Sequence, residues 1–116
     1  MQFKCYRLRE YRMMSYSEFA VFKADHKWVV GILPNADEWL LPYGVTLKEV
    51  EQAPQLLRIS RFTLVARQHI LGVSGAHNRK ELETGVGVFR FSRQLCTKSF
   101  EAIARSNAGG SLALKD

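Results

Sequence analysis

The segment EFAVFKADHKWVVGIL, residues 18–33, decides the fold class of this chain. Its two halves, residues 18–24 and 27–33, are rich in aromatic and β-branched residues, which favour strands. Between them, Asp25-His26 is a short polar pair of the kind found in tight turns. Pro34 ends the second strand because proline has no N–H to donate to a sheet. The segment therefore predicts a β-hairpin.

Three further segments extend the sheet. The side chains of residues 2–12 and 85–91 alternate between two faces with the two-residue period of strands. Residues 61–71 fit a strand with Phe62 and Leu64 facing inward and Arg61 facing outward. Their apolar residues would also share one face of a helix. Phe, Thr and Val in this segment favour the strand, and the helix stays open as the alternative.

Two helices are predicted. Residues 47–53 begin with Thr46 as N-cap and Glu49 three residues later, with Val45 and Val50 at the staple positions, and Pro54 ends this helix. Residues 93–106 form the second helix, with Ser92 as its cap. Residues 107–110 carry the expected stop signal, and Leu112–Leu114 is a candidate for a short last strand.

Together these elements predict an α+β fold. We expect a mostly antiparallel sheet of about five strands, with two helices packed on one face. A chain of 116 residues that is 47% hydrophobic has the length and composition of one compact domain, 1–116, with 106–116 as a candidate loose C-terminal tail.

The small number of cysteines and the absence of a long apolar segment predict a protein of a reducing compartment. Cys5 and Cys96 are the only cysteines and are expected to be reduced, buried thiols. The longest apolar run, Trp28–Pro34, is far shorter than the roughly 20 residues that span a bilayer. No signal-peptide pattern follows the N-terminus. We therefore expect a cytoplasmic protein that does not enter a membrane.

The formal net charge of +6 is distributed unevenly along the chain. Residues 1–16, 56–70 and 85–116 each carry +3, and residues 34–55 carry −3. If the strands at 2–12, 61–71 and 85–91 are neighbours, their arginines share one basic sheet face. This predicted face consists of Arg7, Arg9, Arg61, Arg67 and Arg90.

A basic face beside aromatic side chains suits nucleic acid, because cations pair with phosphates and bases stack on rings. The leading hypothesis is therefore a small non-enzymatic binding protein whose basic face contacts nucleic acid or an acidic protein surface. The loop predicted at 72–84 adds a second candidate set of polar and basic residues, since loops often carry binding residues. That set is His77, Asn78, Arg79 and Lys80.

A different hypothesis is a homo-oligomeric scaffold or a small-ligand-binding domain. The acidic segment 37–51 of one copy is a candidate partner for the basic face of another. Trp28, Trp39 and Tyr43 are candidates to line an apolar pocket or contact. Around Trp39, the segment 35–43 is predicted to cover the core, with an exposed partner contact as the alternative.

Enzymatic function is the weakest hypothesis. A histidine-dependent hydrolase or nuclease needs His69 and His77 to converge with Arg79 or Lys80. No histidine pairs at metal-ligand spacing with another histidine, a cysteine or a glutamate, so no metal is expected. Gly85 and Gly87 lack the third glycine of a dinucleotide fingerprint, and no cofactor is predicted.

Overall fold

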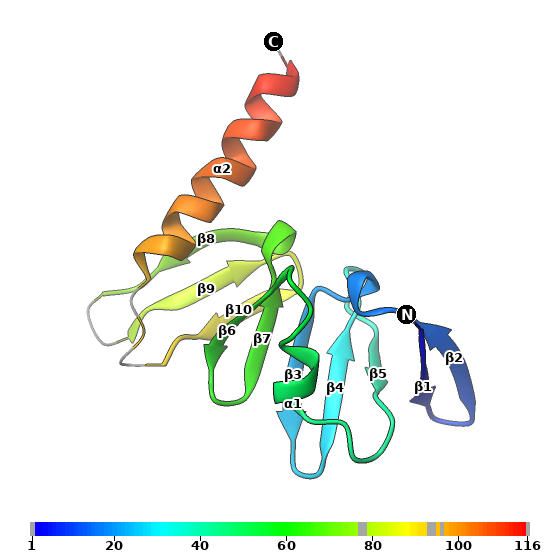
Figure 1. The fold of residues 1–116 in the computed structure, drawn as a ribbon. Coiled ribbons are helices and arrows are strands. Elements are labelled where there is room, and N and C mark those ends of the chain that lie inside the picture. The colour runs from blue at the N-terminus through cyan, green and yellow to red at the C-terminus, as the bar shows by residue number, and fades with distance from the viewer. Residues whose placement is uncertain (1, 77–78, 93–94, 96, 116) are drawn as a thin grey trace.

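The computed structural model describes residues 2–76, 79–92, 95 and 97–115, which form two antiparallel sheets and two helices (Figure 1). The seven-stranded sheet has the order β2-β1-β5-β4-β3-β7-β6. Its strands are β1 (Phe3–Arg7), β2 (Glu10–Met14), β3 (Val21–Asp25), β4 (Trp28–Ile32), β5 (Glu38–Leu40), β6 (Leu56–Ser60) and β7 (Thr63–Ala66). The three-stranded sheet has the order β10-β9-β8. Its strands are β8 (Ile70–Ser74), β9 (Glu81–Thr84) and β10 (Gly87–Arg90).

The remaining elements connect or cover these sheets. They are α1 (Leu47–Val50), α2 (Lys98–Lys115) and the 3-10 turns η1 (Tyr16–Glu18) and η2 (Arg67–His69). The mostly antiparallel, compact single-domain arrangement is confirmed. The predicted number of about five strands was too low, because the described residues form ten strands in two sheets.

Two hydrophobic cores hold the molecule together. The first contains Phe19, Phe22 and Trp39 and is covered by Leu47 and Val50 of α1. The second lies between the two sheets and α2. Its members include Ile59, Ile70, Leu82, Phe91 and Phe100. The prediction that both helices pack on one face is therefore wrong, since each helix covers a different core.

The central hairpin is confirmed, with its turn displaced by one residue. Asp25 pairs with Trp28, so the turn is His26-Lys27, and His26 takes the left-handed conformation at φ +57°. Gly31 in β4 allows Phe19 to pack directly on the strand, because a Cβ there would lie 2.5 Å from the Phe19 ring. The hairpin thus contributes to the first core as well as to the sheet.

The predicted first strand, 2–12, is wrong as a single element. It is the β1–β2 hairpin, which turns at Leu8-Arg9, and Leu8 is fully exposed with φ +49°. The burial of Cys5 is confirmed. Burial is the main cause that raises the pKa of its thiol to about 12, and the negative charge of Glu18 is the second cause. The structure of Cys96 lies outside the described residues.

Helix α1 begins where predicted and ends early. The Thr46 hydroxyl accepts a hydrogen bond from the Glu49 N–H at 3.3 Å, which confirms the N-cap. The helix ends at Val50 instead of residue 53, with Glu51 as its C-cap.

Residues 61–71 are neither one strand nor a helix. Strand β7 ends at Ala66, the η2 turn follows, and β8 begins at Ile70 in the other sheet. The predicted loop 72–84 is largely β8 and β9, and β5 and β6 were not predicted. The strand predicted at 85–91 is shorter, because Gly85 and Val86 form the β9–β10 turn.

The second helix starts and ends later than predicted. It begins at Lys98, so Ser92 does not cap it, and it continues through residues 107–110 to Lys115. The stop signal was misread because the Asn107 side chain does not cap its own helix. It donates hydrogen bonds to the carbonyls of Arg67 and Ile70 at 3.1 and 2.8 Å. Residues 112–114 are therefore helical and not a strand, and the candidate tail is helical through residue 115.

Along the described chain, no helix is long and apolar enough to cross a membrane.

Candidate nucleic-acid interface

The five arginines of the predicted basic face do not share one sheet face. Strands β5, β4 and β3 separate β1 from β7, and β10 belongs to the other sheet. The expectation that these strands are neighbours is therefore wrong. The arginines instead occupy β1 (Arg7), the β1–β2 turn (Arg9), the β6–β7 turn (Arg61), η2 (Arg67) and β10 (Arg90).

Arg7 is engaged within its own chain. Its Nη1 lies 3.2 Å from Oδ2 of Asp37, and its guanidinium lies 5.7 Å from the centre of the buried Trp39 ring. Asp37 belongs to the acidic segment expected to meet a second copy. Glu51, from the same segment, pairs with Arg58. Two acids of segment 37–51 thus have partners inside the chain, and its role in oligomerisation stays a prediction.

Two hairpin turns lie side by side at one end of the seven-stranded sheet (Figure 1). Lys23 of β3 pairs with Thr63 of β7, and the Ala24 N–H donates to the Phe62 carbonyl at 2.8 Å. These contacts hold the β6–β7 turn beside the β3–β4 turn. Residues 43–46, which precede α1, complete this end of the sheet.

We call this surface the turn edge. It surrounds an open groove of about 510 Å³. The turn edge consists of His26, Lys27, Trp28, Tyr43, Arg58, Arg61 and Phe62. No carboxylate is among the described residues that line the groove.

Only part of the predicted aromatic set gathers here. Trp28 and Tyr43 meet edge to face, with ring centres 5.3 Å apart. Trp39 is 2% exposed in the first core and does not line this groove. Segment 35–43 therefore covers the core through Trp39, while Tyr43, 69% exposed, faces outward, and a partner contact there stays a prediction.

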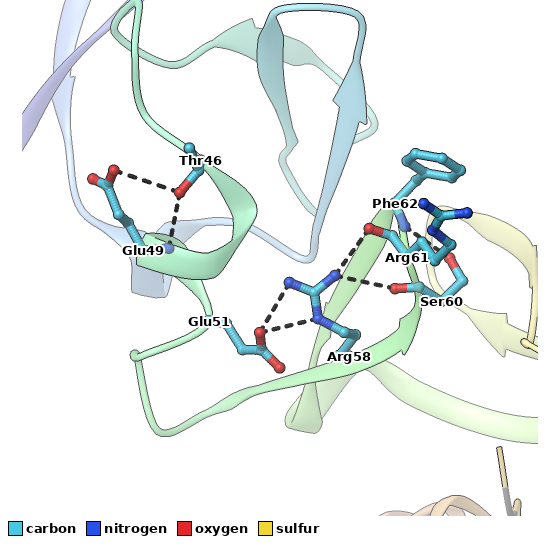
Figure 2. A network of polar contacts seen from close by, with 7 residues as sticks. All are labelled: Thr46, Glu49, Glu51, Arg58, Ser60, Arg61 and Phe62. Carbon is cyan, nitrogen blue, oxygen red and sulfur yellow. Dashed lines mark hydrogen bonds and ion pairs between the residues drawn. The ribbon is translucent and has the colours of Figure 1, made fainter.

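Arg58 holds the β6–β7 turn in shape (Figure 2). Its Nε and Nη2 lie 3.0 and 2.9 Å from one carboxylate oxygen of Glu51. Its Nη1 donates to the Arg61 carbonyl at 2.9 Å, with the Ser60 carbonyl at 3.4 Å. The guanidinium thus ties the turn to the segment after α1 and orients the residues at its tip.

Arg61 and Phe62, at the tip of the β6–β7 turn, place a cation beside an exposed ring. The Arg61 guanidinium lies 5.6 Å from the centre of the Phe62 ring, and Phe62 is 58% exposed. The strand pattern wrongly predicted Phe62 as inward-facing, because the turn at 61–62 removes it from the alternation. Within the described chain, Lys27 and Arg61 have no carboxylate within ion-pair distance. A surface with free cations and exposed rings suits a phosphate-bearing polymer.

The second predicted set, from loop 72–84, is only partly described. His77 and Asn78 lie outside the described residues. Arg79 is exposed, and the Lys80 ammonium donates to the Thr97 hydroxyl at 3.2 Å, which links the residue before β9 to the residue before α2. His69 lies in η2, where burial lowers the pKa of its imidazole. In the described ranges, no three metal-ligating side chains converge.

Sequence reasoning missed His26, Lys27, Arg58 and Phe62 as members of one surface. The polar turn between two well-predicted strands was a usable signal for His26 and Lys27. Arg58 gave no such signal because β6 was not predicted, and strand order alone brings its turn to the β3–β4 turn.

Comparison with known proteins gives a fold and no family. No family model and no curated protein sequence matches the chain. Among solved structures, it is similar to one described as the LytTr DNA-binding domain of a response regulator from Bacillus cereus. That likeness has a TM-score of 0.66 at 17% sequence identity and covers 93% of this chain and 96% of that one. At this identity it establishes the fold alone.

Proposed function

We propose that this chain is a non-enzymatic, cytoplasmic DNA-binding protein whose turn edge contacts the duplex. The observation that carries the proposal is the adjacency of two protruding hairpin turns with the cations Lys27 and Arg61 and exposed aromatic rings. The likeness to a domain named for DNA binding, over nearly the full length of both chains, supports the same class. Binding to an acidic protein surface is the competing outcome of the test.

A hairpin is an element that a DNA groove can admit. The major groove of B-DNA is about 12 Å wide and admits a two-stranded β-ribbon. In the proposed complex one hairpin turn enters the groove, and Lys27 and Arg61 pair with phosphates on its borders. Arg58 acts through the turn that it holds, so it is a positioning residue. Phe62 and Tyr43 supply apolar contacts to sugars and bases.

The test is the salt dependence of binding. Fluorescence anisotropy with a labelled duplex should show affinity falling steeply between about 50 and 200 mM salt. Each phosphate contact adds about 0.9 to the logarithmic slope, so Lys27→Ala/Arg61→Ala should lower that slope by about 2. A labelled single strand, measured in parallel, identifies the preferred form of DNA.

The matched control removes two exposed cations away from the turn edge. Arg67 follows the opposite end of β7, and Arg105 lies on α2, which runs away from the turns (Figure 1). Arg67→Ala/Arg105→Ala should leave the slope within about half a unit of the original. If both double variants lower the salt slope equally, the DNA is attracted non-specifically by the positive charge of the whole surface. A flat salt response would refute DNA binding altogether.

A further inference from the structure

Strand β2 is an open edge of the seven-stranded sheet. It pairs with β1 through five residue pairs on one side, and no described strand lies on its other side (Figure 1). An open edge displays backbone N–H and C=O groups that are available to pair with another strand. Four of its five residues are exposed.

The hairpin register determines which backbone groups point outward. Because Leu8-Arg9 is a two-residue turn, Arg7 and Glu10 form a hydrogen-bonded pair. Hydrogen-bonded and non-hydrogen-bonded pairs alternate along an antiparallel ladder, so Arg12 also points its backbone groups toward β1. Tyr11 and Met13 therefore present theirs to the open edge.

Charge selects one register for pairing β2 with a second copy of itself. If a two-fold axis passes through Tyr11, Glu10 of each copy lies opposite Arg12 of the other. If the axis passes through Arg12 or Glu10, two like charges face each other instead. An axis through Met13 places Arg12 opposite Met14, which is fully buried. The axis through Tyr11 alone makes two opposite-charge pairs.

We propose that the chain forms a two-fold dimer by antiparallel pairing of β2 strands, with Tyr11 on the axis. The outward backbone groups of Tyr11 bond to their counterparts. Glu10 and Arg12 then fall at non-hydrogen-bonded positions, where opposed Cα atoms are only about 4.5 Å apart. On the other face of the sheet, Tyr11 is 63% exposed and Met13 47% exposed, and pairing covers both.

This interface differs from the one predicted through the acidic segment 37–51, and it does not depend on DNA binding. Five residues per copy bury little surface, so the dimer belongs to the weak class. We expect sedimentation velocity to show a monomer–dimer equilibrium between about 10 µM and 1 mM.

Charge exchange tests the register. Glu10→Arg alone and Arg12→Glu alone each place like charges opposite one another, and each should weaken the dimer about tenfold or more. The double variant Glu10→Arg/Arg12→Glu restores opposite pairs and should dimerise as the original does. Mixing the two single variants should produce the heterodimer, in which every pair is again opposite. Single and double variants of equal affinity would overturn the register.

A proline substitution tests the use of the strand edge itself. Because the Tyr11 N–H points away from β1, Tyr11→Pro removes an edge donor without breaking the hairpin. A cooperative unfolding transition would confirm that the variant folds, and the folded variant should stay monomeric at about 1 mM. The proposal is refuted if folded Tyr11→Pro dimerises with the affinity of the unaltered protein. It is also refuted if the unaltered protein is monomeric at that concentration.

Discussion

Replacing Arg58 tests whether one side chain holds the β6–β7 turn. The side chains of Arg58 and Glu51 are 31% and 38% exposed, so their ion pair is worth about 0.5–1 kcal/mol after solvent screening. The hydrogen bond to the Arg61 carbonyl at 2.9 Å adds about 1 kcal/mol. The contact to the Ser60 carbonyl, at 3.4 Å, is too long to add much. Arg58→Met should therefore lower the free energy of unfolding by about 1.5–2 kcal/mol.

Chemical denaturation of four variants isolates the ion pair from the carbonyl contact. Arg58→Met, Glu51→Gln and their double variant form a cycle with a coupling energy of about 0.5–1 kcal/mol. Arg58→Lys keeps the charge but loses the planar fork, so it should recover less than half of the lost stability. If Arg58→Met changes the unfolding free energy by less than about 0.3 kcal/mol, the turn does not depend on these contacts.

Three further substitutions address the core, a cap and a titrating group. Gly31→Ala places a Cβ about 2.5 Å from the Phe19 ring and should cost about 1–3 kcal/mol in urea unfolding, and an unchanged midpoint would show that the ring moves aside. Thr46→Ala removes the bond to the Glu49 N–H and should cost about 1 kcal/mol, whereas Thr46→Ser keeps it and should not. Burial lowers the pKa of His69 in the folded state, so its contribution to stability is present above about pH 6.5 and is lost as the pH falls. His69→Gln should therefore lose less stability than the original protein between about pH 7 and pH 5, and parallel pH profiles would contradict this.

The sequence was informative where neighbouring residues interact. The hairpin around His26 and the cap at Thr46 depend on contacts within a few residues, and both were predicted. The stop signal at Asn107 failed because its amide bonds to carbonyls 37 and 40 residues away. No local pattern distinguishes such a residue from a helix cap.

The residues of the turn edge were not predicted as one site, because they are distant in sequence and no local pattern connects them. Arg61, Trp28 and Tyr43 were named, but in separate sets with different roles. They meet because β3 is placed between β4 and β7, which is a property of strand order. Conversely, Arg7 was grouped with Arg61 by charge alone, although Asp37 pairs with it inside the chain.

The pairing of acids within the chain changes what the net charge of +6 means for binding. Asp37 and Glu51, from the one acidic stretch, neutralise Arg7 and Arg58 locally, and the other described Lys and Arg side chains, Lys27 and Arg61 among them, have no described carboxylate partner. A surface attracts phosphates through its unpaired cations, because paired ones already have their counter-charge. Removing Asp37 should therefore strengthen non-specific DNA attraction at Arg7, whereas Lys27 and Arg61 should still determine binding at the turn edge. In anisotropy, Asp37→Asn should raise the affinity of the Lys27→Ala/Arg61→Ala variant without restoring the affinity of the original. Full restoration would mean that total charge, and not the arrangement of the turns, governs binding.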